Sequence, residues 1–186
     1  VTVGTFALVA ILSAFNGLDS SIKSLFSSFD PDIKISAAQG KSFDLKDGNF
    51  EAIGQLNGIS SVTPVIEEDA LLRYGKDRQY FATLKGVPAN YNEVSGLDTS
   101  SISSGRFILE SQQIPFAVVG QGVAYYLSVG LNFSDPIHVY ALKKGTHGRP
   151  SLANAFVHNT IYASGIFSNQ QEIDSKYVLV PFAYAQ

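Results

Sequence analysis

The stretch VVGQGVAYYLSVG, residues 118–130, is a first candidate for chemistry, because Gly120 and Gly122 lie between an expected strand and an expected helix. Glycines at this spacing let a backbone approach a pyrophosphate in dinucleotide-binding loops. The third glycine of that motif would fall at position 125, which is Tyr125. No suitable acidic residue follows about 20 positions later, where it would bind a ribose. The spacing therefore indicates a tight strand-to-helix turn rather than a nucleotide site.

Histidines and carboxylates are the next candidates, and their spacing does not indicate a catalytic or metal site. His138, His147 and His158 have none of the spacings typical of zinc ligands. The adjacent acids at 67–69 lie in an expected strand, where consecutive side chains point to opposite faces. The chain has no cysteine, and no serine lies in a nucleophile elbow. We expect a non-enzymatic protein without a metal or cofactor.

A cationic loop is the most distinctive chemical feature. Residues 143–151 hold four of the chain's basic or potentially basic side chains within seven positions and no acid. Flanking strands would make this loop a projecting arm. One interpretation is a mobile surface hairpin. The other is a contact site for a protein with an acidic or carbonyl-rich face, in which Arg149 offers forked hydrogen bonds. The candidate contact residues are Lys143, Lys144, His147, Arg149 and Pro150.

Composition limits the classes of function that the chain can have. Its 186 residues are 45% hydrophobic and 16% charged, with a net charge of -3. The basic residues form no stripe, so nucleic acid is not an expected partner. The chain has no methionine, which indicates a piece of a longer protein.

The first thirty residues predict one long helix that is apolar on all sides at first and amphipathic further along. Residues 1–18 carry no charge and, as a helix, would be about 27 Å long, close to a bilayer's hydrocarbon thickness. Beyond Asp19 a single apolar face continues, as expected for a helix leaving lipid for water. A buried core helix and a cleaved signal peptide are the alternatives. We expect a stiff helix that is anchored in the membrane, ends at Asp30 and transmits motion to the rest of the domain as a lever. The residues expected to matter for this coupling are Asn16, Gly17, Leu25, Phe26 and Phe29.

The rest of the chain predicts a mixture of short strands and helices. The expected strands are 32–36, 62–74, 79–87, 114–119, 137–142, 158–167 and 177–181, and the expected helices are 49–56 and 121–129. Residues 89–106 are expected to connect them. The final FAYAQ resembles the opening turn of a further helix, so we expect the C-terminal part of the fold to be missing. The order of elements predicts an α+β fold with two lobes.

Several blocks together resemble a known family. They are LSAFNGLDSSIKSLFSSFDPDIKI (12–35), LKGV (84–87), SGRFI (104–108), VVGQGVAYYL (118–127) and SGIFSNQQEIDSKYVLVP (164–181). In this order they resemble the periplasmic core of MacB-like and FtsX-like ABC transporter permeases, with the LolC/LolE lipoprotein-releasing type closest.

The resemblance implies a domain organisation and a set of partners. It implies a bacterial inner-membrane permease whose periplasmic domain follows the first transmembrane helix, with a cytoplasmic ATPase bound as a dimer and a second permease subunit. Residues 1–18 would end that helix, 19–88 form a membrane-proximal lobe, 89–154 a second lobe, and 155–186 return to the first lobe. The loop 143–154 would be the hook that recruits a LolA-like chaperone for a lipoprotein substrate.

Three departures and two alternatives accompany this interpretation. His138 stands where the family has a basic residue before the hook, and Leu152-Ala153 replace a polar pair after Pro-Ser. Residues 132–135 replace the family's usual Gly-Asp after the 121–129 helix. The alternatives are a macrolide or peptide exporter of the MacB type and an anchored extracytoplasmic sensor or interaction module. An enzyme would instead require a pocket in which His138, Asp135 or Glu172 converge.

Overall fold

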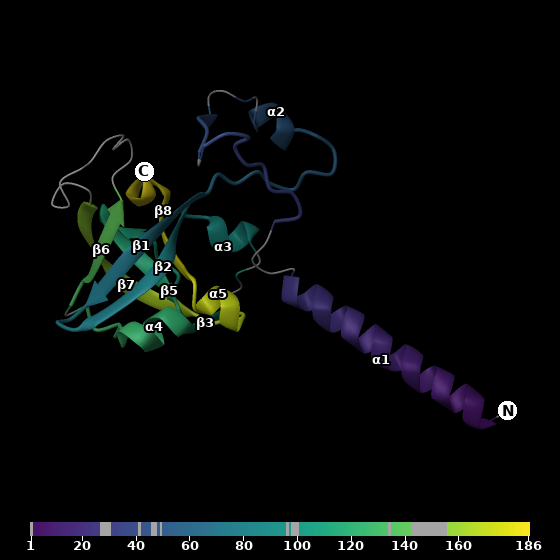
Figure 1. Ribbon diagram of the computed structural model, residues 1–186. Coiled ribbons are helices and arrows are strands. Elements are labelled where there is room, and N and C mark those ends of the chain that lie inside the picture. Colours follow the sequence, from purple (N-terminus) through teal and green to yellow (C-terminus); the bar gives the residue numbers. More distant parts are fainter. Residues whose placement is uncertain are drawn as a thin grey trace. The chain divides into compact units, whose positions relative to one another are not determined.

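The computed structural model describes residues 2–26, 31–40, 42–45, 48, 50–95, 97, 101–133, 135–142 and 156–186. Within these ranges, the side chains of residues 2, 20–26 and 51 are not described. The chain divides into two units, residues 1–34 and residues 35–186 (Figure 1). Each unit is described by itself below.

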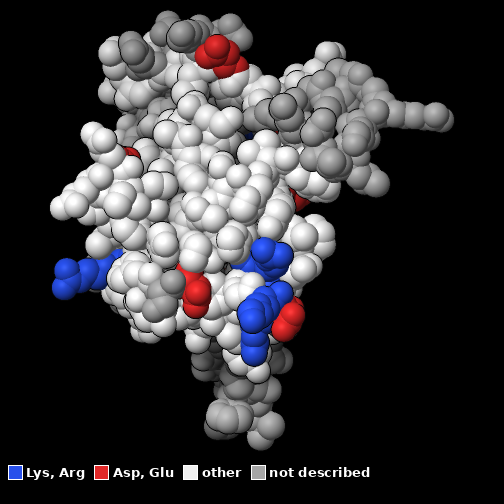
Figure 2. All heavy atoms as spheres, turned by 90° about the vertical axis from the view of Figure 1, so that its left-hand side faces the viewer, with Lys and Arg blue, Asp and Glu red and all other residues white. Residues whose placement is uncertain are grey.

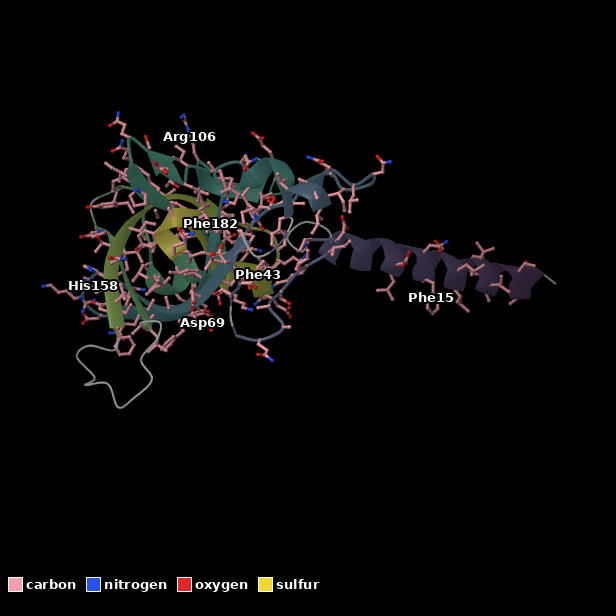
Figure 3. All side chains as sticks on the ribbon, turned by 90° about the horizontal axis from the view of Figure 1, so that it is seen from above. Phe15, Phe43, Asp69, Arg106, His158 and Phe182 are labelled. Atoms are coloured by element: carbon pink, nitrogen blue, oxygen red, sulfur yellow. The ribbon has the colours of Figure 1, made fainter. Side chains whose placement is uncertain are left out.

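The first unit contains one helix, α1 (Thr2–Phe26). The helix runs without interruption through Asn16 and Gly17, which confirms the predicted continuous helix as far as Phe26. Large apolar side chains are exposed along its described length, and Phe15, which is 67% exposed, projects from it (Figure 3). No helix within the described residues combines the length and the hydropathy needed to cross a membrane.

The second unit is built around an eight-stranded sheet with short helices. Its strands are β1 (Ile66–Tyr74), β2 (Arg78–Val87), β3 (Ile102–Gly105), β4 (Glu110–Ser111), β5 (Ile114–Gly120), β6 (Ile137–Leu142), β7 (Phe156–Phe167) and β8 (Tyr177–Pro181). Its helices are α2 (Phe50–Gly54), α3 (Tyr91–Val94), α4 (Gln121–Leu127), α5 (Gln171–Asp174) and α6 (Phe182–Ala185). The mixed α/β architecture agrees with the predicted class (Figure 1).

Six of the eight strands are joined in a closed ring of pairings, and β3 and β4 each pair with one strand of that ring. The order is β3-β7-β6-β1-β2-β8-β5-β4, and β5 also pairs with β7. The β1–β2, β1–β6, β6–β7 and β5–β8 pairs are antiparallel, whereas β2–β8 and β5–β7 are parallel. Strands from both predicted lobes therefore share one sheet, and the division into two lobes stays a prediction.

One face of this sheet forms the hydrophobic core. Alternate residues of the strands point to this face because side chains alternate along a strand, so Leu72, Leu84 and Val139 are buried together. Helix α4 adds Val123, Ala124 and Leu127 to the same cluster. The predicted burial of Ala124 and Leu127 on this helix is confirmed, as is the burial of most of β8.

The other face of the sheet is covered in part by α3. Here the buried Lys85 ammonium lies 5.5 Å from the ring centroid of Tyr91 and 5.4 Å from that of Tyr177. Its Nζ is also 3.8 Å from a carboxylate oxygen of Glu67. A buried ammonium needs such partners because desolvation of an unpaired charge is costly.

One predicted strand is wrong. Residues 32–36 alternate as predicted, yet they adopt no strand, and both Ile33 and Ile35 are exposed. Alternation produces a strand only where a neighbouring strand pairs with the backbone, and no described strand pairs with this segment. The predicted helix at 49–56 is confirmed in a shorter form as α2, although Leu56, expected inward, is exposed.

The turn before α5 depends on the buried carboxylate of Asp174. One oxygen accepts a hydrogen bond from the Asn169 amide at 2.8 Å, and the other accepts one from Ser168 Oγ at 3.2 Å. Burial raises the pKa of Asp174 above its ordinary value, although these hydrogen bonds and the Gln170 amide act in the opposite direction. The folded state therefore favours the neutral carboxyl more than the unfolded state does.

We expect Asp174→Asn to flatten the pH dependence of stability. The contribution from a raised carboxyl pKa is fully present below the unfolded pKa, about 3.9, and is lost as the pH rises through the folded pKa. The neutral amide does not undergo that loss, so the variant should gain stability relative to the wild type as the pH rises above the unfolded pKa and through the folded one. Urea unfolding at a series of pH values measures this, and parallel curves for the two proteins would contradict it.

Candidate functional site

The cationic loop of the sequence connects the two strands of a hairpin. Strands β6 and β7 pair in antiparallel register from Ile137 opposite Ile161 to Leu142 opposite Phe156. The predicted flanking strands are thus confirmed, and β7 begins two residues earlier than predicted. The candidate contact residues Lys143, Lys144, His147, Arg149 and Pro150 all lie in the connecting segment, outside the described residues.

The hairpin forms because its sequence alternates between two environments. Ile137 and Val139 point into the core and are buried, whereas His138 and Tyr140 lie on the outward face. In β7 the core contact begins at Ile161, and the residues before it are exposed. The hairpin therefore extends beyond the core toward the loop.

The described end of the hairpin is apolar and open to solvent. Leu142 is 69% exposed and its cross-strand partner Phe156 is 49% exposed. Further back on the same face, Phe81, Leu71 and Tyr140 are opposite one another across β2, β1 and β6, and Phe81 is 76% exposed. Exposed apolar groups that gather on one face are typical of a protein-interaction surface.

Charged side chains are sparse on the adjacent surface. In Figure 2 most of the described surface in view carries neither Lys and Arg nor Asp and Glu, and the charged groups that are coloured lie mainly toward one end. A partner that binds such a face would gain most of its affinity from apolar and aromatic contacts.

Two histidines meet on the outward face of the hairpin. His138 Nδ1 and His158 Nε2 are 3.0 Å apart. The ring centroids are 5.3 Å apart and the planes differ by 15°. Since the centroids are much farther apart than the nitrogens, the rings meet edge to edge and nearly coplanar, as in an N–H···N hydrogen bond. Figure 3 marks His158 on the hairpin.

Neighbouring side chains pack against this histidine pair and alter its electrostatic environment. Tyr140 stacks on His158 with the ring centroids 4.7 Å apart, and the Arg73 guanidinium lies 5.8 Å from the Tyr140 centroid. Burial lowers the pKa of His138, and electrostatic repulsion from Arg73 and from His158 lowers it further. His138 is therefore neutral at neutral pH, with one ring nitrogen free of a proton.

A second surface feature lies beside α4. Tyr126 stacks on Tyr80 with the ring centroids 4.9 Å apart, and the Tyr80 hydroxyl donates a hydrogen bond to the Ser175 carbonyl at 2.9 Å. An open hollow of about 500 Å³ is lined by Arg78, Tyr125, Tyr126 and Ser128. The hollow is shallow and open to solvent.

The other chemical candidates of the sequence have structural roles. The Gly120-x-Gly122 turn is filled by the chain itself, because backbone atoms of Asp174 and atoms of Ser175 take the space beside the two glycines. Asp69 accepts a hydrogen bond from Thr83 Oγ1 at 2.7 Å, and Glu67 pairs with Lys85. Within the described part of the chain, no group of three or more metal-ligating side chains occurs.

The predicted lever residues are only partly described. Asn16 and Gly17 lie inside α1. The backbones of Leu25 and Phe26 belong to the last turn of this helix, but their side chains are not described, and Phe29 lies outside the described residues. The anchoring of Leu25, Phe26 and Phe29 on the sheet unit stays a prediction.

Comparison with known families decides the broad assignment. The family model of the MacB-like periplasmic core domain matches residues 1–138. The chain belongs to this family. Membership in the MacB-like family implies the periplasmic domain of a membrane-anchored ABC transporter permease, a class that works with a cytoplasmic ATPase and a partner permease. No curated protein matches the chain at a significant level. The MacB-like match ends at His138, so the remainder of the β6–β7 hairpin lies beyond it.

The histidine pair is the feature of this MacB-like domain that sequence reasoning missed. Because Tyr140 is opposite His158, His138 and His158 are diagonal neighbours across the strands. Diagonal neighbours are close enough for long or aromatic side chains to touch. The signal was the placement of all three histidines between 138 and 158, on both sides of one predicted loop. Only the register, which spacing alone does not give, brings two of them together.

Proposed function

We propose that this chain is the periplasmic domain of an inner-membrane permease that releases lipoproteins from the membrane and passes them to a periplasmic chaperone. The observation that carries the proposal is the β6–β7 hairpin. It ends in the exposed apolar pair Leu142 and Phe156, and its connecting sequence is cationic. A hairpin with an exposed apolar end and a cationic connecting sequence suits a partner with an acidic, partly apolar face. The sequence resemblance to LolC/LolE permeases supports the same substrate class.

In this proposal the domain is moved by its helix and performs no chemistry itself. A dimeric ATPase in the cytoplasm hydrolyses ATP, and a second permease subunit, identical or related, completes the transporter. Residues 1–18 root α1 in the membrane, and the rest of the helix acts as a stiff lever. The unbroken helix from Thr2 to Phe26 supports this role, because an α-helix transmits displacement along its axis with little bending.

A MacB-type exporter of macrolides or peptides is the second candidate. The match of residues 1–138 to the MacB-like family model supports it as well as the first candidate, because that match does not distinguish substrate classes. The two candidates differ in their soluble partner. A lipoprotein-releasing permease needs a periplasmic lipoprotein chaperone at its hairpin, whereas an exporter does not.

The test is capture of a LolA-like chaperone by the membrane-embedded permease. We expect Arg149→Glu to lower chaperone binding by about tenfold or more, because reversal of an interfacial charge replaces attraction with repulsion. Lys76→Glu is the matched control, since it makes the same charge change on the exposed β1–β2 turn. Equal capture by the Arg149 variant and the wild type would overturn the role of the hairpin. Absence of capture by the wild type itself would favour the exporter.

A further inference from the structure

The two histidines of the hairpin have the spacing of metal ligands. Two imidazole nitrogens on one tetrahedral zinc ion lie about 3.3 Å apart, as follows from Zn–N bonds of about 2.05 Å. Adjacent corners of a square-planar copper site are closer, about 2.8 Å apart. The observed separation of 3.0 Å between His138 Nδ1 and His158 Nε2 lies between these two values. Each ring must turn by roughly 35–45° from the line of the present N–H···N contact to direct both lone pairs at one ion, given metal–nitrogen bonds of about 2.05 Å.

We propose that His138 and His158 form a two-nitrogen site for a borderline divalent transition-metal ion, with Cu²⁺ bound most tightly. Imidazole suits copper, nickel and zinc, and the affinity of a given nitrogen site is highest for Cu²⁺. Water or another molecule completes the coordination. This site is independent of the substrate and the chaperone suggested above.

The surroundings prepare the two rings for a shared ion. The β6–β7 ladder fixes the distance between the two backbones, and Tyr140 stacked on His158 restricts the orientation of that ring. His158 is exposed and His138 half-buried, so an ion can reach the pair and keep open positions for water. Because the ladder already holds the two backbones side by side, the pair loses less conformational entropy on binding than two ligands on separate flexible segments would.

The charges near the pair also predict its selectivity. On β1, Arg73 is directly opposite His138 and disfavours any cation at this position. On β6 and β7, the described residues that flank the two histidines carry no acid. A two-ligand site without a carboxylate, beside a guanidinium, should not hold hard ions such as Mg²⁺ or Ca²⁺, which prefer oxygen ligands. Only ions that bond strongly to nitrogen can overcome the repulsion from Arg73.

An ion bound by both histidines would crosslink the two strands of the hairpin. The site lies four residues before the end of β6 and two residues after the start of β7. A bound ion would therefore join the strands close to the exposed Leu142 and Phe156 pair and limit their separation. Binding to the folded state alone also raises stability by mass action.

Copper titration of the whole chain tests the proposal. CuSO₄ is added at pH 7.5, and electron paramagnetic resonance counts the nitrogens on the ion while calorimetry measures the affinity. We expect one Cu²⁺ per chain with two imidazole nitrogens. His138→Asn and His158→Asn should each weaken binding by about a hundredfold, because either change removes the chelate. Zn²⁺ and Ni²⁺ should bind more weakly than Cu²⁺, and Mg²⁺ should not compete.

The third histidine provides the control. His147→Asn removes an imidazole from the same hairpin and should retain both the affinity and the two-nitrogen signature. Thermal unfolding in EDTA checks that each variant is folded, which we expect because His158 is exposed and His138 half-buried. Failure of the wild type to bind Cu²⁺, unchanged binding in either pair variant, or an equal loss in His147→Asn would each overturn the site.

Discussion

Replacement of Gly120 by alanine is expected to destabilise the sheet domain by about 2–3 kcal/mol, the cost typical of an added methyl group in a closely packed interior. Gly120 is the last residue of β5, and α4 begins at the next residue. A Cβ atom at this position would lie within 2.9 Å of both the Asp174 carbonyl carbon and the Tyr177 carbonyl oxygen, and closer still to the Asp174 carbonyl oxygen. These neighbours are backbone atoms, which cannot move away as the end of a side chain can. Thermal unfolding followed by circular dichroism should show a melting temperature lower by about 5–10 °C.

Gly130→Ala is the matched control for this prediction. It makes the same change shortly after α4, where the nearest atoms to a new Cβ belong to the Asn132 side chain and begin at 3.5 Å. We expect a change in the free energy of unfolding of less than about 0.5 kcal/mol. Equal melting temperatures for the Gly120 and Gly130 variants would show that the segment 174–177 does not pack against the glycine turn.

Two prolines in α1 are expected to abolish transport by the permease while ATP hydrolysis continues. Ser20→Pro with Ser24→Pro removes two backbone donors inside the helix, and each proline costs about 3 kcal/mol at an interior position. If α1 is the lever of our proposal, a break between its two halves separates the membrane segment from the periplasmic domain. The measurement is substrate release from proteoliposomes that contain the permease and its ATPase, with phosphate release followed in parallel.

Ser20→Ala with Ser24→Ala controls for the loss of the two hydroxyl groups. Alanine raises helix propensity, so this variant should transport at the wild-type rate. Transport that survives the two prolines would argue against a stiff lever. Loss of both transport and ATP hydrolysis would instead indicate that the prolines disrupt assembly of the complex.

Local patterns in the sequence predicted most of the elements correctly. The β1–β2 hairpin was predictable because two β-rich runs flank a Gly-Lys-Asp segment, and Gly75 adopts the positive φ of 64° that such a turn favours. Helix α4 and the strand before it were predictable from a change of period at Gly120. In each case neighbours in the sequence determine the structure.

The remaining features depend on contacts between distant residues or on unusual turns. The closure of the sheet requires parallel pairing of β5 with β7 and of β2 with β8, which no local pattern specifies. The β4–β5 hairpin turns through Gln112 and Gln113 with φ values of 51° and 65°. Glycine or asparagine normally marks such a turn, so the two glutamines gave no signal for it.

The candidate site likewise combines features that local sequence predicts with a contact that depends on distant residues. The position of the hairpin and of its cationic loop followed from the strands on either side. The contact between His138 and His158 depends on the register of β6 against β7, and a shift by one residue would place either ring on the opposite face. Register is fixed by burial of Ile137, Val139 and Ile161 together, which is a property of the assembled core.

The length of β7 has a mechanical consequence for a transporter domain. The first half of this strand forms the hairpin with β6, and its second half runs parallel to β5 and beside β3. A load applied where a partner docks would thus travel along one continuous strand into the sheet, across the register shift between Ala163 and Gly165. Because such a load acts along the strand, it strains the hydrogen bonds to the neighbouring strands in shear and all together. It does not break these bonds one after another. The arm and the body should therefore shift as a single rigid piece during each cycle.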